Sequence, residues 1–155
     1  MIKYKVGFTA GTFDMFHVGH LNLLQEAKKE CDYLIVGVNK DELVRQYKHK
    51  APLIDETQRV DIVKSIKYVD EAHLMDSLDK SEAWSKYNFD AIFIGSDYQN
   101  SDRYNYEESN MKGKNVEIVY VPYTLGVSST ILAKRIINDH ITREFFENEI
   151  KNRVR

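Results

Sequence analysis

Two histidines stand three positions apart near the start of the chain, in the stretch GTFDMFHVGH at residues 11–20. A short apolar run precedes this stretch and an apolar pattern with helical spacing follows it, so His17 and His20 are expected at a strand-to-helix turn. A helix N-terminus attracts anions, because its free backbone N–H groups and its dipole both point there. Residues i and i+3 share one face of a helix, so both imidazoles can point into the same space. The pattern favours a phosphate site, in which imidazole N–H groups donate to phosphoryl oxygens.

Two other interpretations of the histidine pair stay open. A zinc site needs at least one more good ligand, and the remaining candidates, His49, His73, His140 and Cys31, show no ligand spacing. The pair can also serve a purely structural purpose, in which each ring satisfies backbone groups of the loop.

The elements that must position these side chains alternate between strands and helices. The apolar run YLIVGV at 33–38 is typical of a strand in a parallel sheet covered on both faces. Asp55 is expected to open a helix, with Gln58 as its capping-box partner. We expect strands at 5–9, 33–38, 71–75, 91–94 and 116–121, helices at 20–29, from 55, at 81–87, 128–137 and 142–154, and a loop at 39–54. This order predicts one α/β domain over residues 1–155, a Rossmann-like doubly wound parallel sheet flanked by helices, with ligands at the carboxyl ends of its strands.

Composition narrows the function classes. The chain has 155 residues, of which 43% are hydrophobic and 30% charged, and its formal net charge is −2. That balance gives no support to bulk binding of nucleic acid or membrane surfaces. No apolar run approaches the roughly 20 residues of a membrane span. The single cysteine, Cys31, forms no internal disulfide, and we expect a cytoplasmic protein.

The two short signatures of the chain resemble those of the HxGH nucleotidyltransferases. GTFDMFHVGH is similar to their first signature, and GVSSTI at 126–131 is similar to the second, at the start of the last core helix. The resemblance extends through LIVGVNKDE, KYVDE and IGSD, covers roughly residues 3–137, and is greatest to the glycerol-3-phosphate cytidylyltransferase family. Since HxGH is shared by adenylyl- and cytidylyltransferases, it specifies the reaction class and not the base.

The resemblance implies that CTP and a phosphorylated small alcohol, with glycerol 3-phosphate favoured, give a CDP-linked product and pyrophosphate. It also implies Mg²⁺, or another divalent cation, held mainly by the nucleotide phosphates. One alternative is an adenylyltransferase that uses ATP and a flavin or pantetheine phosphate. Others are a cytidylyltransferase for another sugar, amino-alcohol or amino-acid phosphate, and a nucleotide-binding sensor without catalysis.

The family pattern assigns roles to particular positions. A phosphomonoester is already ionised near pH 7, so the chemistry needs alignment and charge relief and no strong general base. By resemblance, His17, His20, Lys50 and Ser129 are catalytic, and Lys48 and Arg59 bind the acceptor. The expected nucleotide-binding residues are Thr9, Ala10, Gly11, Thr12, Phe13, Asp14, His17, Gly19, His20, Lys50, Asp97, Tyr123, Thr124, Gly126, Val127, Ser128, Ser129 and Thr130.

One departure from the family pattern concerns the residues before the second signature. Close relatives usually carry RTEG there, whereas this chain has YTLG, with Tyr123 in place of the arginine and Leu125 in place of the acidic residue. Tyrosine cannot replace a guanidinium fork, so either another cation such as Arg103 takes that role, or the acceptor or nucleotide differs. The tyrosine-rich segment 98–110 is expected to be an acceptor-side loop or a subunit contact. The stripe formed by Phe146, Ile150 and Val154 is typical of a helix packed on its own domain or on a partner, and by resemblance we expect a homodimer.

Overall fold

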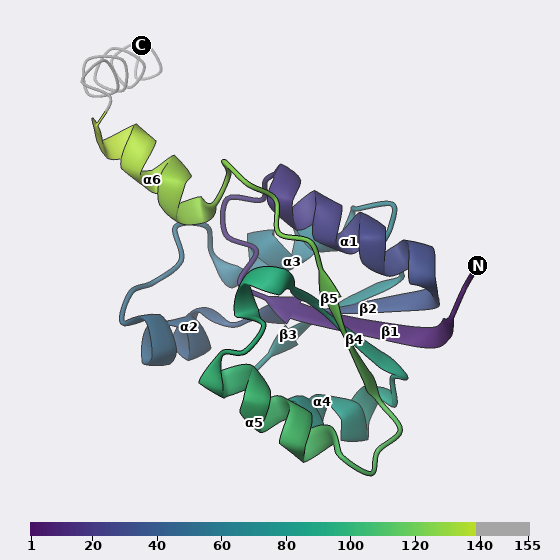
Figure 1. Ribbon diagram of the computed structural model, residues 1–155. Coiled ribbons are helices and arrows are strands. Elements are labelled where there is room, and N and C mark those ends of the chain that lie inside the picture. The colour runs from purple at the N-terminus through teal and green to yellow at the C-terminus, as the bar shows by residue number, and fades with distance from the viewer. Residues whose placement is uncertain (139–155) are drawn as a thin grey trace.

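The computed structural model describes residues 1–138, in which every strand belongs to one parallel sheet (Figure 1). The strands are β1 (Tyr4–Gly11), β2 (Cys31–Asn39), β3 (Glu71–Met75), β4 (Ala91–Gly95) and β5 (Glu117–Val121). Their order across the sheet is β3-β2-β1-β4-β5. The expected Rossmann-like α/β fold is therefore confirmed, and the order reverses between β1 and β4, where ligands bind in such sheets.

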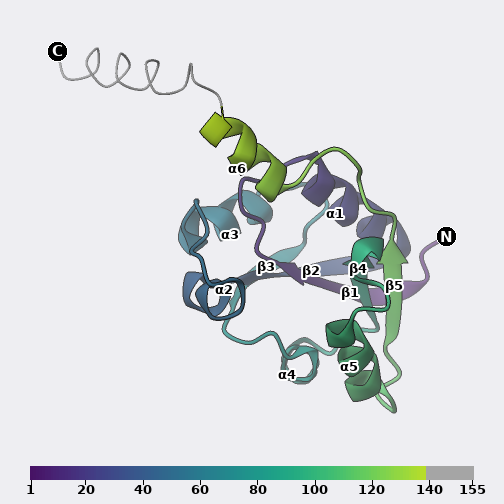
Figure 2. The same ribbon diagram turned by 60° about the vertical axis from the view of Figure 1, so that its left-hand side comes forward.

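Helices cover both faces of the sheet. Figure 2 shows α1 (Val18–Glu30) and α3 (Glu56–Lys64) on one face, and α4 (Lys80–Tyr87) and α5 (Asp102–Met111) on the other. The helix α2 (Asp41–Lys48), a single 3-10 turn at Ser96–Tyr98 and α6 (Ser129–Asn138) complete the described elements. The expected helix at 142–154 lies outside the described residues.

Strand side chains alternate between two apolar cores, as the two-residue period of a strand requires. In β2, Leu34, Val36 and Val38 pack in the core beneath α1 and α3, whereas Ile35 belongs to the core beneath α4 and α5. Because both faces are covered, β2 is a nearly continuous apolar run, and this explains why it was readable from sequence.

Two helices occupy segments that were expected to be loops. In 39–54, Leu43 and Val44 of α2 are buried, but these two residues are too few to show a helical period. In 98–110, the buried residues of α5 are Tyr104, Glu107 and Met111, at helical spacing. Since one of the three is an acid, the apolar pattern of α5 is interrupted in the sequence.

The remaining expectations agree with the structure to within a few residues at the element ends. Asp55 caps α3, and its carboxylate accepts from the backbone N–H groups of Thr57 and Gln58. Gln58 also donates its side-chain amide to the Asp55 carboxylate, so the capping partner was correctly predicted although its bond goes to the side chain.

Candidate active site

The first signature is a tight turn between β1 and α1. Phe13 and Met15 adopt left-handed backbone conformations, with φ of 54° and 47°. Such conformations are costly for residues with large side chains and persist where the surroundings hold them. Phe13 is buried, and its ring centroid lies 5.3 Å from that of His20 and 6.4 Å from that of Phe16. This aromatic packing fixes the turn that carries the histidines.

Backbone bonds set the tautomers of both histidines. Nδ1 of His17 accepts from the backbone N–H of Gly19 at 3.1 Å, and Nδ1 of His20 accepts from that of His17 at 3.3 Å. Nδ1 is therefore unprotonated in each ring, and the neutral rings carry their proton on Nε2. Burial lowers the pKa of His17 and lowers that of His20 to about 3. At neutral pH the pair offers two uncharged Nε2–H donors.

The packing of the histidine rings explains why a glycine, Gly19, stands between them in the sequence. The two ring centroids lie 3.8 Å apart with an interplanar angle of 24°. A Cβ at Gly19 would lie 2.9 Å from Cε1 of His17, closer than real Cβ contacts. Any larger residue at position 19 would force the His17 ring to shift.

The second signature forms the start of α6 and contacts the first. Gly126 has φ of 82°, a conformation that favours glycine. The Ser128 hydroxyl accepts from the backbone N–H of Ile131 at 3.0 Å and caps the helix. The Ser129 hydroxyl donates to the backbone oxygen of Asp14 at 2.5 Å. The N-termini of α1 and α6 are thus tied to one another through the first signature.

The lysine-bearing segment after α2 is held by an acid of the first signature. The Asp14 carboxylate accepts from the backbone N–H groups of Leu53, at 2.8 Å, and Ile54, at 2.9 Å. Lys48 donates its Nζ to the Thr12 hydroxyl at 3.3 Å. Asp14 therefore fastens the segment 49–54 across the site, a role that the sequence did not indicate.

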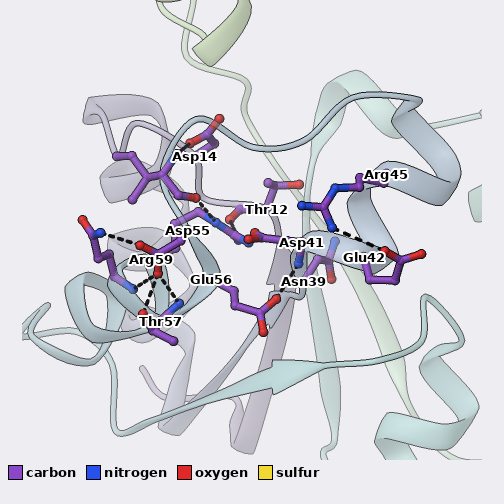
Figure 3. Close-up of polar contacts among 12 residues, drawn as sticks. Thr12, Asp14, Asn39, Asp41, Glu42, Arg45, Asp55, Glu56, Thr57 and Arg59 are labelled. Carbon is purple, nitrogen blue, oxygen red and sulfur yellow. Dashed lines mark hydrogen bonds and ion pairs between the residues drawn. The ribbon is translucent and has the colours of Figure 1, made fainter.

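The acceptor-binding role expected for Arg59 does not fit its position. Its side chain is fully buried beneath the site and donates to the backbone oxygens of Thr12 and Ile54 and to the Asp41 carboxylate (Figure 3). With these three acceptors taken, Arg59 joins the first signature to α2 and to the segment before α3. We correct its assignment from ligand binding to positioning.

The site residues surround two pockets at the carboxyl ends of the strands. We call them the α2-side pocket, about 500 Å³, and the β5-side pocket, about 430 Å³. Seven residues line both pockets, so the two meet there: His20, Leu23, Lys48, Gly95, Tyr98, Ser129 and Thr130.

The expected site residues divide between the pockets, and only Gly126 and Arg59 line neither. The α2-side pocket alone takes Thr9, Ala10, Gly11, Thr12, Phe13, Asp14 and Lys50. The β5-side pocket alone takes His17, Gly19, Asp97, Tyr123, Thr124, Val127 and Ser128.

Several lining residues of the α2-side pocket were not expected as site residues. Three of them are Asn39 at the end of β2, Tyr47 on α2 and Tyr104 on α5, the last within the segment 98–110 that was expected to be an acceptor-side loop or a subunit contact. Asn39 was detectable, because it follows a buried parallel strand directly and ligands gather at such ends. The two tyrosines lie on α2 and α5, in segments whose sequence pattern predicts loops. Arg103 also lines this pocket, whereas Tyr123 lines the β5-side pocket.

Residues 1–138 contain no cluster of three or more His, Cys, Asp or Glu side chains that could hold a metal ion. The Asp14 carboxylate already accepts two backbone N–H groups. Within the same residues, no helix is long and apolar enough to cross a membrane.

Comparison with known proteins places this geometry in a family. The cytidylyltransferase-like family model matches residues 8–148. The FAD synthase of Korarchaeum cryptofilum is 37% identical over 131 residues, which are 83% of this chain and 88% of that protein. The bifunctional protein HldE of Hyphomonas neptunium is 33% identical over 132 residues, which are 84% of this chain but 27% of HldE, so the chain spans about a quarter of that relative.

A solved structure agrees with the sequence matches. The lipopolysaccharide core biosynthesis protein from Thermoplasma volcanium GSS1 superposes with a TM-score of 0.68 and 31% identity, over 78% of this chain and 98% of that one. Since the family match extends across both signatures and the sheet that carries them, the chain belongs to the cytidylyltransferase-like family, of the HxGH type, and is a nucleotidyltransferase.

Proposed function

We propose that the protein transfers an adenylyl group from ATP to the phosphate of a small phosphomonoester and releases pyrophosphate. The observation that carries this proposal is the meeting of two anion-suited pockets at His20, Lys48, Ser129 and Thr130. Each pocket receives one substrate, and the reacting phosphates meet where the pockets join.

The β5-side pocket suits the triphosphate. It contains both histidines and the hydroxyls of Ser128, Ser129 and Thr130 at the start of α6. Helix N-termini and preset N–H donors stabilise phosphate without any change of protonation. The α2-side pocket suits the acceptor phosphomonoester, because it adds Lys50 to Lys48.

The transfer proceeds as a direct displacement. An oxygen of the acceptor phosphate forms a bond to the α-phosphorus, the bond from that phosphorus to the bridging oxygen breaks, and pyrophosphate leaves with that electron pair. The Nε2–H groups of His17 and His20 stabilise the charge that develops on the phosphoryl oxygens. With Asp14 engaged by backbone groups, Mg²⁺ would be held mainly by the triphosphate, as this hard cation prefers, and would offset its charge.

ATP replaces CTP as the favoured donor. The matched proteins of Korarchaeum cryptofilum and Thermococcus kodakarensis are named FAD synthase, and the second is 35% identical over 80% of its length. Formation of FAD adds an adenylyl group to a flavin phosphate, so FMN enters the acceptor candidates. CTP stays a second candidate because the matching family is described as cytidylyltransferase-like. The comparisons give no support to glycerol 3-phosphate in particular.

The placement of the two lysines supports a reversal of their expected roles. Lys50 lines only the α2-side pocket, whereas Lys48 lines both. We therefore assign Lys50 to the acceptor phosphate and Lys48 to the junction, where it contacts both substrates.

A pyrophosphate-release screen tests the function. Purified protein with Mg²⁺ is given ATP or CTP against FMN, glycerol 3-phosphate and a panel of sugar, amino-alcohol and hydroxy-acid phosphates. We expect acceptor-dependent release that is faster with ATP than with CTP. Faster release with CTP would overturn the donor assignment, and no acceptor-dependent release with either nucleotide would contradict the proposed transfer. The homodimer stays a prediction, which sedimentation analysis checks.

A further inference from the structure

Arg103 occupies an unusual position in the α2-side pocket. Its guanidinium carbon lies 5.8 Å from the ring centroid of Tyr47 on α2 and 5.8 Å from that of Tyr104 on α5. Contact with two aromatic rings holds a guanidinium in place and leaves its N–H edge available. Within residues 1–138 no hydrogen bond or ion pair of Arg103 is found. Arg103 is thus a positioned and unpaired cation in a ligand pocket.

A second polar group in the same pocket also lacks a partner. Asn39 is 4% exposed, and its Nδ2 donates to the Tyr47 hydroxyl at 3.2 Å. Its Oδ1 is buried and accepts no hydrogen bond from the described residues. A buried amide oxygen without a donor is costly, so its place in a pocket lining indicates a hydroxyl or N–H group on the ligand.

The α2-side pocket carries more positive charge than the single reacting phosphate of the acceptor requires. The lining carries three cations, Lys48, Lys50 and Arg103, and one acid, Asp14, whose two oxygens accept backbone N–H groups. Glu107 and the buried Lys80 lie near Arg103, and burial together with the Arg103 charge lowers the pKa of Lys80 to about 8. Lys48 and Lys50 already serve the reacting phosphate under the proposed function, so Arg103 is left for another group.

We propose that Arg103 selects acceptors that carry a second anionic group, a carboxylate or a second phosphate, at the end away from the reacting phosphate. The inference rests on the proposed function, since it takes the α2-side pocket as the acceptor site. Asn39 then accepts from a hydroxyl or N–H group of the same acceptor. FMN, whose ring carries no such charge at neutral pH, is a weaker acceptor than a phosphorylated hydroxy acid of suitable length.

Three acceptors with three-carbon backbones test the inference. Glycerol 3-phosphate has an uncharged far end, 3-phosphoglycerate ends in a carboxylate, and propane-1,3-diol bisphosphate ends in a phosphate. Affinities are measured by calorimetry in the presence of α,β-methylene-ATP, and kcat/KM by pyrophosphate release with ATP. We expect at least one two-anion acceptor to exceed glycerol 3-phosphate by about tenfold in both quantities.

Variants connect the preference to the residue. Arg103→Gln should abolish the tenfold advantage, so that the two-anion acceptors fall to the level of glycerol 3-phosphate measured in the same variant. Arg103→Lys should retain part of the advantage. The matched control is Arg45→Gln, because Arg45 is an exposed arginine on α2 that pairs with Glu42 and lines neither pocket.

Three results would overturn the inference. The first is that all three acceptors bind equally or that none of them binds. The second is that the tenfold advantage survives in Arg103→Gln. The third is that the main defect of Arg103→Gln is a higher KM for ATP. The last result would show that Arg103 binds the triphosphate of ATP. Failure of the proposed function looks different, because the calorimetric preference would then persist without any pyrophosphate release.

Discussion

The two pockets differ in how their polar groups are held. At the β5-side pocket, His17, His20, Ser128 and Ser129 each bond to a backbone group of the protein. At the α2-side pocket, Lys50 and Arg103 have no hydrogen bond or ion pair among residues 1–138. Groups fixed by folding need no reorganisation during the reaction. Arg103 is positioned by two tyrosine rings but has no polar partner, and Lys50 loses side-chain freedom when it binds a ligand. Under the proposed function, the comparison teaches that the nucleotide side is preorganised and that the acceptor completes its own side.

The largest expected effect is that of removing the Nε2–H donor of His20. In His20→Asn the shorter side chain retains an acceptor near the Nδ1 position for the His17 backbone N–H, but it loses the Nε2–H group. We expect kcat to fall about 10²–10³-fold, the usual result of removing one preorganised donor. Steady-state pyrophosphate release and circular dichroism check turnover and fold. The control is His73→Asn on β3, outside both pockets. A His20→Asn enzyme within about threefold of wild type would remove the histidine from the chemistry.

The second prediction tests the contacts of Arg59, which join the first signature to α2 and to the segment before α3. Arg59→Met leaves the Asp41 carboxylate and two backbone oxygens without their buried donor. Loss of one partner from a buried pair costs about 3–5 kcal/mol, so we expect the midpoint of thermal unfolding to fall by about 10 °C. Arg45→Met removes an exposed pair as the control and should change the unfolding free energy by under about 1 kcal/mol. Equal stability of the two variants would contradict the positioning role.

The pH dependence of folding tests the burial of His20. Its pKa is about 3 in the folded protein and near 6.5 when unfolded. Between these values the unfolded state binds a proton that the folded state does not, so stability falls as the pH falls below about 6.5. Relative to His20→Asn, wild type should lose about 2 kcal/mol of unfolding free energy between pH 7 and pH 5. Urea unfolding at both pH values measures this difference, and a constant gap between the proteins would show that His20 titrates normally.

The smallest expected effect concerns Asp14 and the segment 49–54 that it holds at the α2-side pocket. Asp14→Asn removes one of the two oxygens that accept from Leu53 and Ile54. The segment 49–54 then positions Lys50 less well, and we expect acceptor kcat/KM to fall about fivefold, which corresponds to about 1 kcal/mol, the usual net value of one hydrogen bond. Hydrogen exchange of the Leu53 and Ile54 amides should accelerate. Unchanged exchange at both amides would refute the fastening role of Asp14.

The sequence indicated the residues of the two signatures but missed two tyrosines of the α2-side pocket, for a physical reason. His17, His20 and Ser129 stand in contiguous signatures whose spacing carries the chemistry. Tyr47 and Tyr104 reach the α2-side pocket from helices whose buried faces are short or interrupted by Glu107. A pattern of apolar residues cannot identify such helices or the residues that they bring together.

Arg59 illustrates a different limit. A basic residue one turn into a capped helix has the same sequence pattern whether it faces a ligand or the protein interior. Only the fold brings the Thr12 oxygen, the Ile54 oxygen and Asp41 around it. Burial of a charged group depends on partners distant in sequence, so its role as a positioning residue could not be predicted.

The most direct test of the two-pocket account takes one variant from each pocket and measures the KM for each substrate in both variants. Lys50 lines only the α2-side pocket and Asp97 only the β5-side pocket. Steady-state kinetics, with ATP and the acceptor varied in turn, should show that Lys50→Ala raises only the KM for the acceptor and Asp97→Ala only the KM for ATP, each by about tenfold. If both variants raised the same KM, or if the two effects were exchanged, the assignment of nucleotide and acceptor to separate pockets would be wrong.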